Sequence, residues 1–168
     1  MNKQVTPFML TVYHSGECGN AKNCRYPYTG TGTTPEELKQ LFCYDHTFIR
    51  FKNNYRSKEN FLEATVATLD NDNDHSDDPA DWIPIESITE LFPGVPCVVS
   101  TSRNHMRQKG ARSPRPRYHV AFPIDPITKP EAYTALMQRV QAMFPFFDGK
   151  ALDAGRFFFG NPDTEVYT

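Results

Sequence analysis

The feature that most constrains the fold is a set of six short segments rich in β-branched and aromatic residues. Each is bounded by Gly, Pro, Asn or Asp, which is the pattern of a β-strand that ends in turns. They predict strands at Phe8–Tyr13, Thr47–Lys52, Leu62–Leu69, Val95–Thr101, Tyr118–Ile124 and Arg156–Phe159. Strands that short must pair with one another and be covered by other elements to bury their apolar sides. A sheet is therefore the expected centre of the molecule.

Three helices are predicted between these strands. Thr34 supplies an N-cap, Pro35 occupies the first helical position and Glu37 completes a capping box. Thr128–Glu131 gives a similar start to a helix that Pro145 ends, and a shorter helix is expected at Ile85–Phe92. Because strands and helices alternate irregularly, the sequence favours an α+β fold with helices on one face of the sheet rather than a parallel βαβ sheet.

Length and composition indicate one domain without a membrane segment. The 168 residues include 13 Phe and 8 Tyr, which is enough apolar surface for a buried core. No apolar stretch approaches the ~18 residues of a membrane span, and the start at Met1–Lys3 lacks a signal-peptide pattern. Four cysteines are too few for a disulfide framework, so we expect a cytoplasmic protein. Since few residues follow the last predicted strand, we also expect the chain to be part of a longer one.

The charged residues are separated into two segments, although the net charge is only −2. Six carboxylates without any Lys or Arg lie in the first segment: Asp70, Asp72, Asp74, Asp77, Asp78 and Asp81. Six cations without any Asp or Glu lie in the second: Arg103, Arg107, Lys109, Arg112, Arg115 and Arg117. Each segment follows an apolar strand, which indicates a metal-binding pole and a phosphate-binding pole at one edge of the sheet.

Asp70 and Asp72 follow the apolar run Ala64–Leu69 directly. In an extended chain, residues two apart point to the same side with Cα atoms about 6.5 Å apart, so both carboxylates face one spot. This spacing suits a pair of divalent cations in phosphoryl transfer. A solvated surface turn is the simpler alternative.

A calcium-binding loop is an alternative interpretation of the acidic segment. Asp70, Asp72, Asp74, Ser76, Asp78 and Asp81 occupy positions 1, 3, 5, 7, 9 and 12 of that pattern. Against it, His75 stands where the loop requires Gly, and the preceding segment is strand-like instead of helical.

His119 lies within the alternating strand that follows the basic segment, where an imidazole facing the core needs a polar partner. The third polar segment contains Asp148, Asp153 and Arg156 after an apolar run, and taken alone it is a turn between a helix and a strand.

In chain order, these three pieces resemble the catalytic motifs of the archaeo-eukaryotic primase superfamily, the primase-polymerases of plasmids, phages and mobile elements. Leu69–Asp72 matches the first motif, Arg117–Phe122 the second, and Phe147–Arg156 the third. The resemblance covers residues 45–160. Many members carry Ser two residues before the motif His, where this chain has Arg117, and both Asp148 and Asp153 are candidates for the third-motif carboxylate.

The resemblance implies an RRM-like antiparallel sheet beside an N-terminal α/β unit, with residues 1–60 as N-terminal subdomain and 61–168 as catalytic core. It implies that two Mg²⁺ or Mn²⁺ ions are held by Asp70, Asp72 and Asp148, with Asp153 as the alternative. The implied nucleotide-binding residues are His119, Ser102, Arg103, Lys109, Arg117 and Arg156. The implied partners are a DNA template, nucleoside triphosphates and a helicase domain or protein, since this chain has no P-loop sequence.

Three other functions are weighed against this one. A non-catalytic replication-initiator or single-strand-binding module would use the basic segment and aromatic residues to hold single strands. Arg50, Lys52 and Arg56 add a small basic face, which is either a contact for the template or a solvated strand edge. A metal nuclease of the nickase type would need a His-hydrophobe-His motif, which the sequence lacks. A zinc site is conceivable at His14, Cys18 and Cys24 with Cys43 or His46, although their spacing is not that of close ligands and free thiols are favoured.

Overall fold

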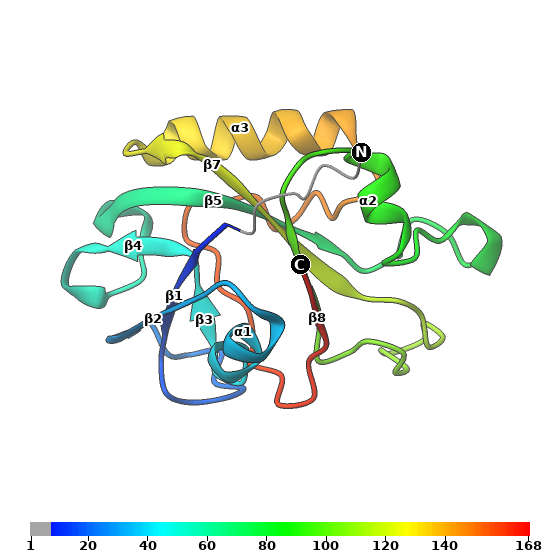
Figure 1. The fold of residues 1–168 in the computed structure, drawn as a ribbon, viewed down its shortest axis with the longest axis horizontal. Coiled ribbons are helices and arrows are strands. Elements are labelled where there is room, and N and C mark those ends of the chain that lie inside the picture. The colour runs from blue at the N-terminus through cyan, green and yellow to red at the C-terminus, as the bar shows by residue number, and fades with distance from the viewer. Residues whose placement is uncertain (1–7) are drawn as a thin grey trace.

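The computed structural model describes residues 8–168 as a mixed α+β fold with two antiparallel sheets (Figure 1). The three-stranded sheet has the order β2 (Tyr28–Gly32), β1 (Leu10–His14), β3 (His46–Thr47). The five-stranded sheet has the order β4 (Ile49–Phe51), β5 (Phe61–Asn71), β7 (Tyr118–Ile127), β6 (Val98–Thr101), β8 (Val166–Tyr167). The helices are α1 (Pro35–Phe42), α2 (Ser87–Leu91) and α3 (Pro130–Met143), with short 3₁₀ turns at Lys52–Asn54, Lys58–Asn60 and Pro79–Asp81.

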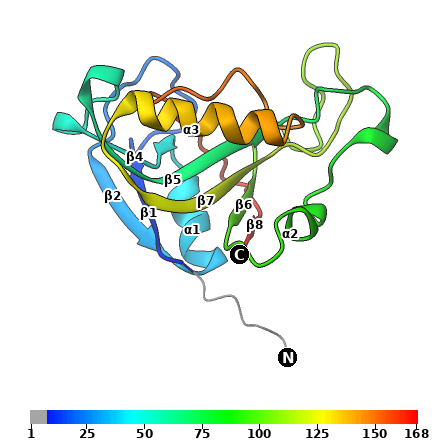
Figure 2. The ribbon, with the colours of Figure 1, turned by 90° about the horizontal axis from the view of Figure 1, so that it is seen from above.

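Two apolar clusters cover the two faces of the five-stranded sheet. On one face α3 lies across β5 and β7 (Figure 2), and Tyr133 and Met137 pack against Leu69 and Val120. On the other face Phe42 of α1 packs with residues of β5, β6 and β7 in a second cluster that also contains Phe158. The α+β prediction is confirmed, and the small sheet with α1 forms the N-terminal part of the fold.

The predicted start of α1 is confirmed in detail. The Thr34 hydroxyl accepts a hydrogen bond from the Glu37 backbone N–H at 3.3 Å, and the Glu37 carboxylate accepts one from the Thr34 N–H at 3.2 Å. These bonds satisfy donors that the first helical turn cannot satisfy itself. They fix the helix so that Leu38 and Phe42 face the core.

Several strand predictions are wrong in their bounds or existence. Arg156–Phe159 is not a strand, because only Phe158 forms a bridge, with His46. The segment 95–97 lies outside β6, whereas β5 continues through Asp70 and Asn71, so the acidic pair begins inside the strand. β2 and β8 were not predicted, since β2 is poor in apolar residues and β8 has only two residues.

Strand β4 precedes residue 60 but pairs with β5, so the chain passes from the small sheet to the large one just after Thr47. The division into subdomains at residue 60 stays a prediction. The start Met1–Lys3, used above to argue against a signal peptide, lies outside the described residues. No helix within residues 8–168 is long and apolar enough to cross a bilayer.

Candidate active site

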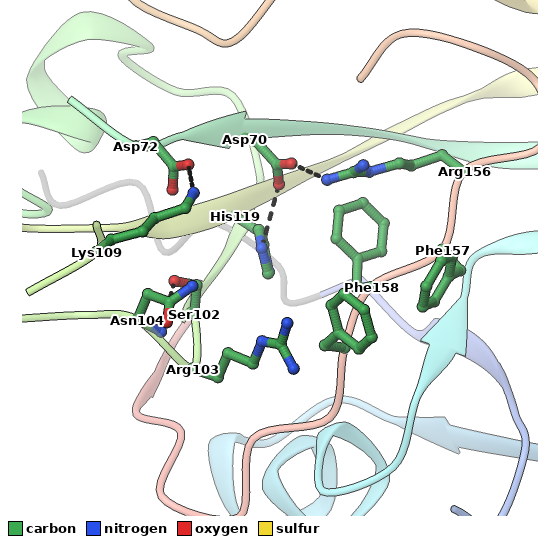
Figure 3. Close-up of a pocket in the computed structure, with 11 residues that line it drawn as sticks. Asp70, Asp72, Ser102, Arg103, Asn104, Lys109, His119, Arg156, Phe157 and Phe158 are labelled. Carbon is green, nitrogen blue, oxygen red and sulfur yellow. Dashed lines mark hydrogen bonds and ion pairs between the residues drawn. The ribbon is translucent and has the colours of Figure 1, made fainter. Parts of the chain in front are cut away.

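A cavity of about 290 Å³ opens on the sheet face opposite α3, where β5 ends and β7 begins (Figure 3). Its walls come from four separate stretches of the chain, which meet only in the folded protein. The lining residues are Asp70, Asp72, Ser102, Arg103, Asn104, Lys109, His119, Arg156 and Phe157–Phe159. Of the ten residues proposed from the sequence for catalysis, metal binding or nucleotide binding, seven line this cavity. The other three are Arg117, Asp148 and the alternative ligand Asp153.

Asp70 lies at the back of this cavity. It is 8% exposed and pairs in register with His119 on β7, whose Nε2 lies 3.1 Å from Asp70 Oδ1. The Arg156 guanidinium forms an ion pair with Oδ2, so Asp70 stands between two nitrogen groups (Figure 3). Burial lowers the pKa of His119, and the Asp70 carboxylate opposes this only in part. His119 is therefore neutral at pH 7, and the positive charge beside Asp70 comes from Arg156.

Asp72 forms the front edge of the cavity. Lys109 Nζ lies 2.5 Å from its Oδ2, and the Arg117 guanidinium Nε lies 3.8 Å from its Oδ1. Asp72 also lines a second cavity of about 310 Å³, which it shares with Asp74 and Asp148. Asp72 is therefore the carboxylate that connects the two cavities.

The third polar segment lies beside the end of β5, because the Asp148 backbone N–H donates a 2.8 Å hydrogen bond to the Asp70 carbonyl. The Asp148 carboxylate lines the second cavity with Asp72, and its Oδ1 accepts a hydrogen bond from the Lys150 N–H. Asp153 lines neither cavity and caps the turn at Gly155. Between the two candidates, only Asp148 is placed near the acidic pair.

The donor set for a metal is incomplete in this arrangement. Within residues 8–168, no group of three or more His, Cys, Asp or Glu side chains is close enough to hold a metal ion. Asp70 Oδ1 is buried and accepts no well-aligned hydrogen bond, with His119 Nε2 at 3.1 Å as its neighbour, and both Asp70 and Asp72 offer the hard oxygen ligands that Mg²⁺ and Mn²⁺ prefer. Two carboxylates fit such an ion, and a third ligand has to come from Asp148 or from a substrate.

The acidic and basic segments do not form two separate poles as expected; they pack against each other. Arg115 and Arg117 are fully buried. Arg117 donates to the carbonyls of Asn104 and Arg107 at 3.2 and 2.8 Å, and Arg115 donates to the Asp77 carboxylate at 3.0 Å. The Arg117 guanidinium therefore lies inside the loop and lines neither cavity, and its predicted contact with nucleotide stays a prediction.

Arg103 differs from these buried arginines. Its guanidinium carbon lies 3.7 Å from the centroid of the Phe159 ring, and it makes no hydrogen bond or ion pair to the chain that the structure describes. The neighbouring Ser102 hydroxyl accepts only the Asn104 backbone N–H. Arg103 and Ser102 are therefore free to bind an anion that enters the cavity.

The geometry gives little support to the other two metal sites considered from the sequence, the calcium loop and the zinc site. In the predicted calcium loop, Asp74 at the fifth position lies 3.5 to 3.7 Å from the side chains of Arg112, Arg115 and Arg117, and the segment joins strand β5 to a 3₁₀ turn instead of joining two helices. In the zinc reading, the Cys18 and Cys43 thiols donate to carbonyl oxygens, and His46 is buried between aromatic rings.

One feature of the site region was not found from the sequence. Asp45 is fully buried, and its carboxylate accepts hydrogen bonds from the backbone N–H groups of Gly19, Asn20 and Gly160 at 2.7 to 2.8 Å. It thereby ties the loop after β1 to the segment that follows Phe159. A single Asp carries no pattern that distinguishes it from a surface residue, so no signal in the sequence marked it.

No protein-family model and no curated protein sequence matches this chain. Among solved structures, the chain is similar to the AEP domain (PP-N190) of the primase-polymerase (PrimPol) of cyanophage S-2L. The similarity covers 99% of this chain and 83% of that domain, with a TM-score of 0.48 and 12% sequence identity. This likeness is too distant to carry an argument about function, which has to come from the site itself.

Proposed function

We propose that this chain is a metal-dependent nucleotidyltransferase of the primase-polymerase type, which joins nucleotides from nucleoside triphosphates on a DNA template. The observation that carries the proposal is the shared cavity: Asp70 and Asp72 line it together with Lys109, Arg103 and Arg156. Nucleotidyl transfer needs carboxylates to hold cations next to basic groups that hold a polyphosphate. The first motif supplies Asp70 and Asp72, the second supplies His119, which lines the same cavity, and the third supplies Arg156.

Asp70 and Asp72 would hold the divalent cations, with Asp148 as the nearest further carboxylate. The buried carboxylate of Asp70, whose Oδ1 accepts no well-aligned hydrogen bond, and the hard oxygen donors of Asp72 support this assignment. When bound, such cations lower the pKa of an attacking 3′-hydroxyl and neutralise charge on the triphosphate.

The basic groups of the cavity would bind the triphosphate. Lys109 and Arg156 are paired with Asp72 and Asp70 in the absence of substrate. Once cations neutralise those carboxylates, both side chains are free to turn to phosphate oxygens. Arg103 forms no ion pair with residues 8–168 and the Ser102 hydroxyl hydrogen is free to donate, while His119, being neutral, offers Nε2–H as a donor without adding charge.

Arg117 takes a different role in this proposal. It is buried and donates to two carbonyls of the basic loop, so it fixes the loop that carries Arg103 and Lys109. It is a positioning residue and does not touch substrate.

One observation favours a second candidate, a non-catalytic module that binds single-stranded nucleic acid. Both cavity carboxylates are neutralised by cations of the protein itself, Arg156 and Lys109, so the fold has no need of a metal ion. Such a module would bind DNA equally well in EDTA and would make no product.

Primer synthesis and primer extension with Mg²⁺ and Mn²⁺ test the proposal. Asp70→Asn and Asp72→Asn should each lower the rate by roughly 100-fold or more, since metal stabilisation of the transition state is worth several kcal/mol. Asp163→Asn is the matched control, because Asp163 is exposed and contacts only the exposed Arg107 by an ion pair. Product formation unchanged in both site variants, or absent from the wild type under all conditions, would refute the assignment.

A further inference from the structure

Three arginine–aromatic pairs form a continuous series that starts on the surface and ends in the cavity. They are Arg25 with Tyr55, Arg56 with Phe157 and Arg103 with Phe159, with guanidinium-to-ring distances of 5.7, 4.5 and 3.7 Å. We refer to these six residues as the arginine–aromatic track. Arg103 is shared with the proposed phosphate-binding residues, and the other five residues of the track have no part in that set or in the acidic pair.

The outer part of the track is held by backbone pairing between two loops. Arg25 and Tyr55 form an antiparallel bridge, and the Arg56 N–H donates a 2.7 Å hydrogen bond to the Cys24 carbonyl. Arg25 and Tyr55 are both exposed, Tyr55 to 41%. A flat ring and a guanidinium are thus presented together on a fixed piece of backbone.

The inner part of the track lies in the cavity. Phe157 and Phe159 are half-buried and pack edge to face at 4.9 Å, whereas Phe158 between them is buried in the core beside His119. Arg56 is fixed by a 2.9 Å hydrogen bond to the Gly155 carbonyl. Phe157, Phe159 and Arg103 line the same cavity as Asp70 and Asp72, so the series leads to the proposed reaction centre.

The surface around the outer pair is basic. Residues 20–26 and 50–58 contain six cations and no carboxylate: Lys22, Arg25, Arg50, Lys52, Arg56 and Lys58. Arg50 and Lys58 form ion pairs with Glu63 and Glu131. Lys22, Arg25 and Lys52 form none with residues 8–168, so their charge is available to a polyanion.

We propose that the arginine–aromatic track binds single-stranded DNA and leads it to the cavity as the template strand. Aromatic rings and guanidinium planes stack with bases of any sequence, and free cations beside them contact the phosphates. This combination suits a strand whose bases are exposed and whose sequence varies, which a template is. The identification of the strand as template rests on the proposed function, but binding of single strands by the track does not depend on catalysis.

Fluorescence anisotropy with a labelled oligo(dT), in EDTA and without nucleotide, measures this binding separately from the reaction. Tyr55→Ala should weaken binding about tenfold, the usual effect of removing one stacking side chain, and Tyr55→Phe should restore it. Arg25→Ala should weaken binding and lower the salt slope by about 0.7, the value for one phosphate contact on a single strand. Arg139→Ala is the control, because Arg139 is exposed on α3 across the sheet and should change nothing.

An abasic strand of the same length separates stacking from charge. On that strand the effect of Tyr55→Ala should vanish, while the effect of Arg25→Ala should remain. Asp70→Asn should leave binding of both strands intact, so a failure of the catalytic proposal remains distinguishable from a failure of this one. The inference is overturned if the wild type does not bind oligo(dT) or if Tyr55→Ala binds it with wild-type affinity. It is also overturned if Tyr55→Ala lowers the affinity for the abasic strand as much as the affinity for oligo(dT).

Discussion

The two halves of the basic loop have the same kind of residues but different surroundings. Arg115 and Arg117, next to β7, are fully buried and donate to backbone carbonyls and carboxylates. Arg103 and Lys109, next to β6 and in the loop's middle, line the cavity. The comparison shows that a run of cations in a sequence does not by itself reveal which of them bind a ligand; burial and existing partners separate them.

The largest loss of stability should come from removing an arginine of the buried half of the basic loop. Arg117→Ala leaves Asp72 and Asp74 near an empty space and removes two donors to loop carbonyls, so we expect a loss of roughly 3–5 kcal/mol in the free energy of unfolding. Urea denaturation measures it. Arg103→Ala, the matched variant in the open half, should stay within about 0.5 kcal/mol of the wild type; equal losses in the two variants would abolish the distinction.

Burial of titratable side chains also makes the stability of the fold depend on pH, and this applies to His46 and His119. Burial lowers the pKa of His46 to about 4, since it packs among Phe42, Phe48 and Phe158 with one nitrogen donating to the Tyr44 carbonyl. A histidine with a lowered pKa in the folded state stabilises the fold above its unfolded pKa of 6.5, and this contribution is lost as the pH falls from 6.5 to about 4.

The loss attributable to His46 is about 3 kcal/mol, from the shift between those two pKa values. The free energy of unfolding, measured by urea denaturation between pH 7 and pH 4, should therefore fall less steeply in His46→Gln than in the wild type. His119 shifts in the same direction, so some slope should remain. Identical slopes for the wild type and His46→Gln would show that burial does not control this titration.

The sequence was informative about the acidic pair and His119, because the acidic pair directly follows a strong strand signal and His119 lies within another. Asp70 and His119 are cross-strand neighbours as the strand assignments allow. The sequence was less informative about Phe157–Phe159, whose high β-propensity suggested a strand. Their rings instead divide between the core and the cavity, which depends on residues far away in the chain, such as Arg56 and Arg103. Burial of Arg117 and Asp45 likewise depends on tertiary contacts that no local pattern encodes.

A smaller effect should come from the open half of the loop. Arg103→Ala and Lys109→Ala should each weaken binding of a nucleoside triphosphate with Mn²⁺ about tenfold, the range for one charge-assisted contact, without a change in stability. Isothermal titration calorimetry gives the affinity. Arg112→Ala, a cation of the same loop that contacts Asp74 outside this cavity, serves for comparison and should bind as the wild type does. Nucleotide affinity that depends on Arg112 but not on Arg103 would contradict the assignment.

The smallest effect is expected for Arg107, which pairs only with the exposed Asp163 at 3.5 Å through its side chain. Arg107→Ala should change the free energy of unfolding by less than about 0.5 kcal/mol, because exposed ion pairs contribute little. Thermal denaturation is sufficient to measure it. A large loss here would mean that exposure does not separate the two kinds of cation in this loop.

The most direct test of the central claim is a titration of Mn²⁺ followed by electron paramagnetic resonance, with a nucleoside triphosphate present and in matched samples without protein. If Asp70 and Asp72 hold catalytic cations beside a bound triphosphate, the wild type should bind Mn²⁺ beyond what the nucleotide binds alone, and Asp70→Asn with Asp72→Asn should abolish that excess. Equal Mn²⁺ binding with and without the wild-type protein would contradict the account.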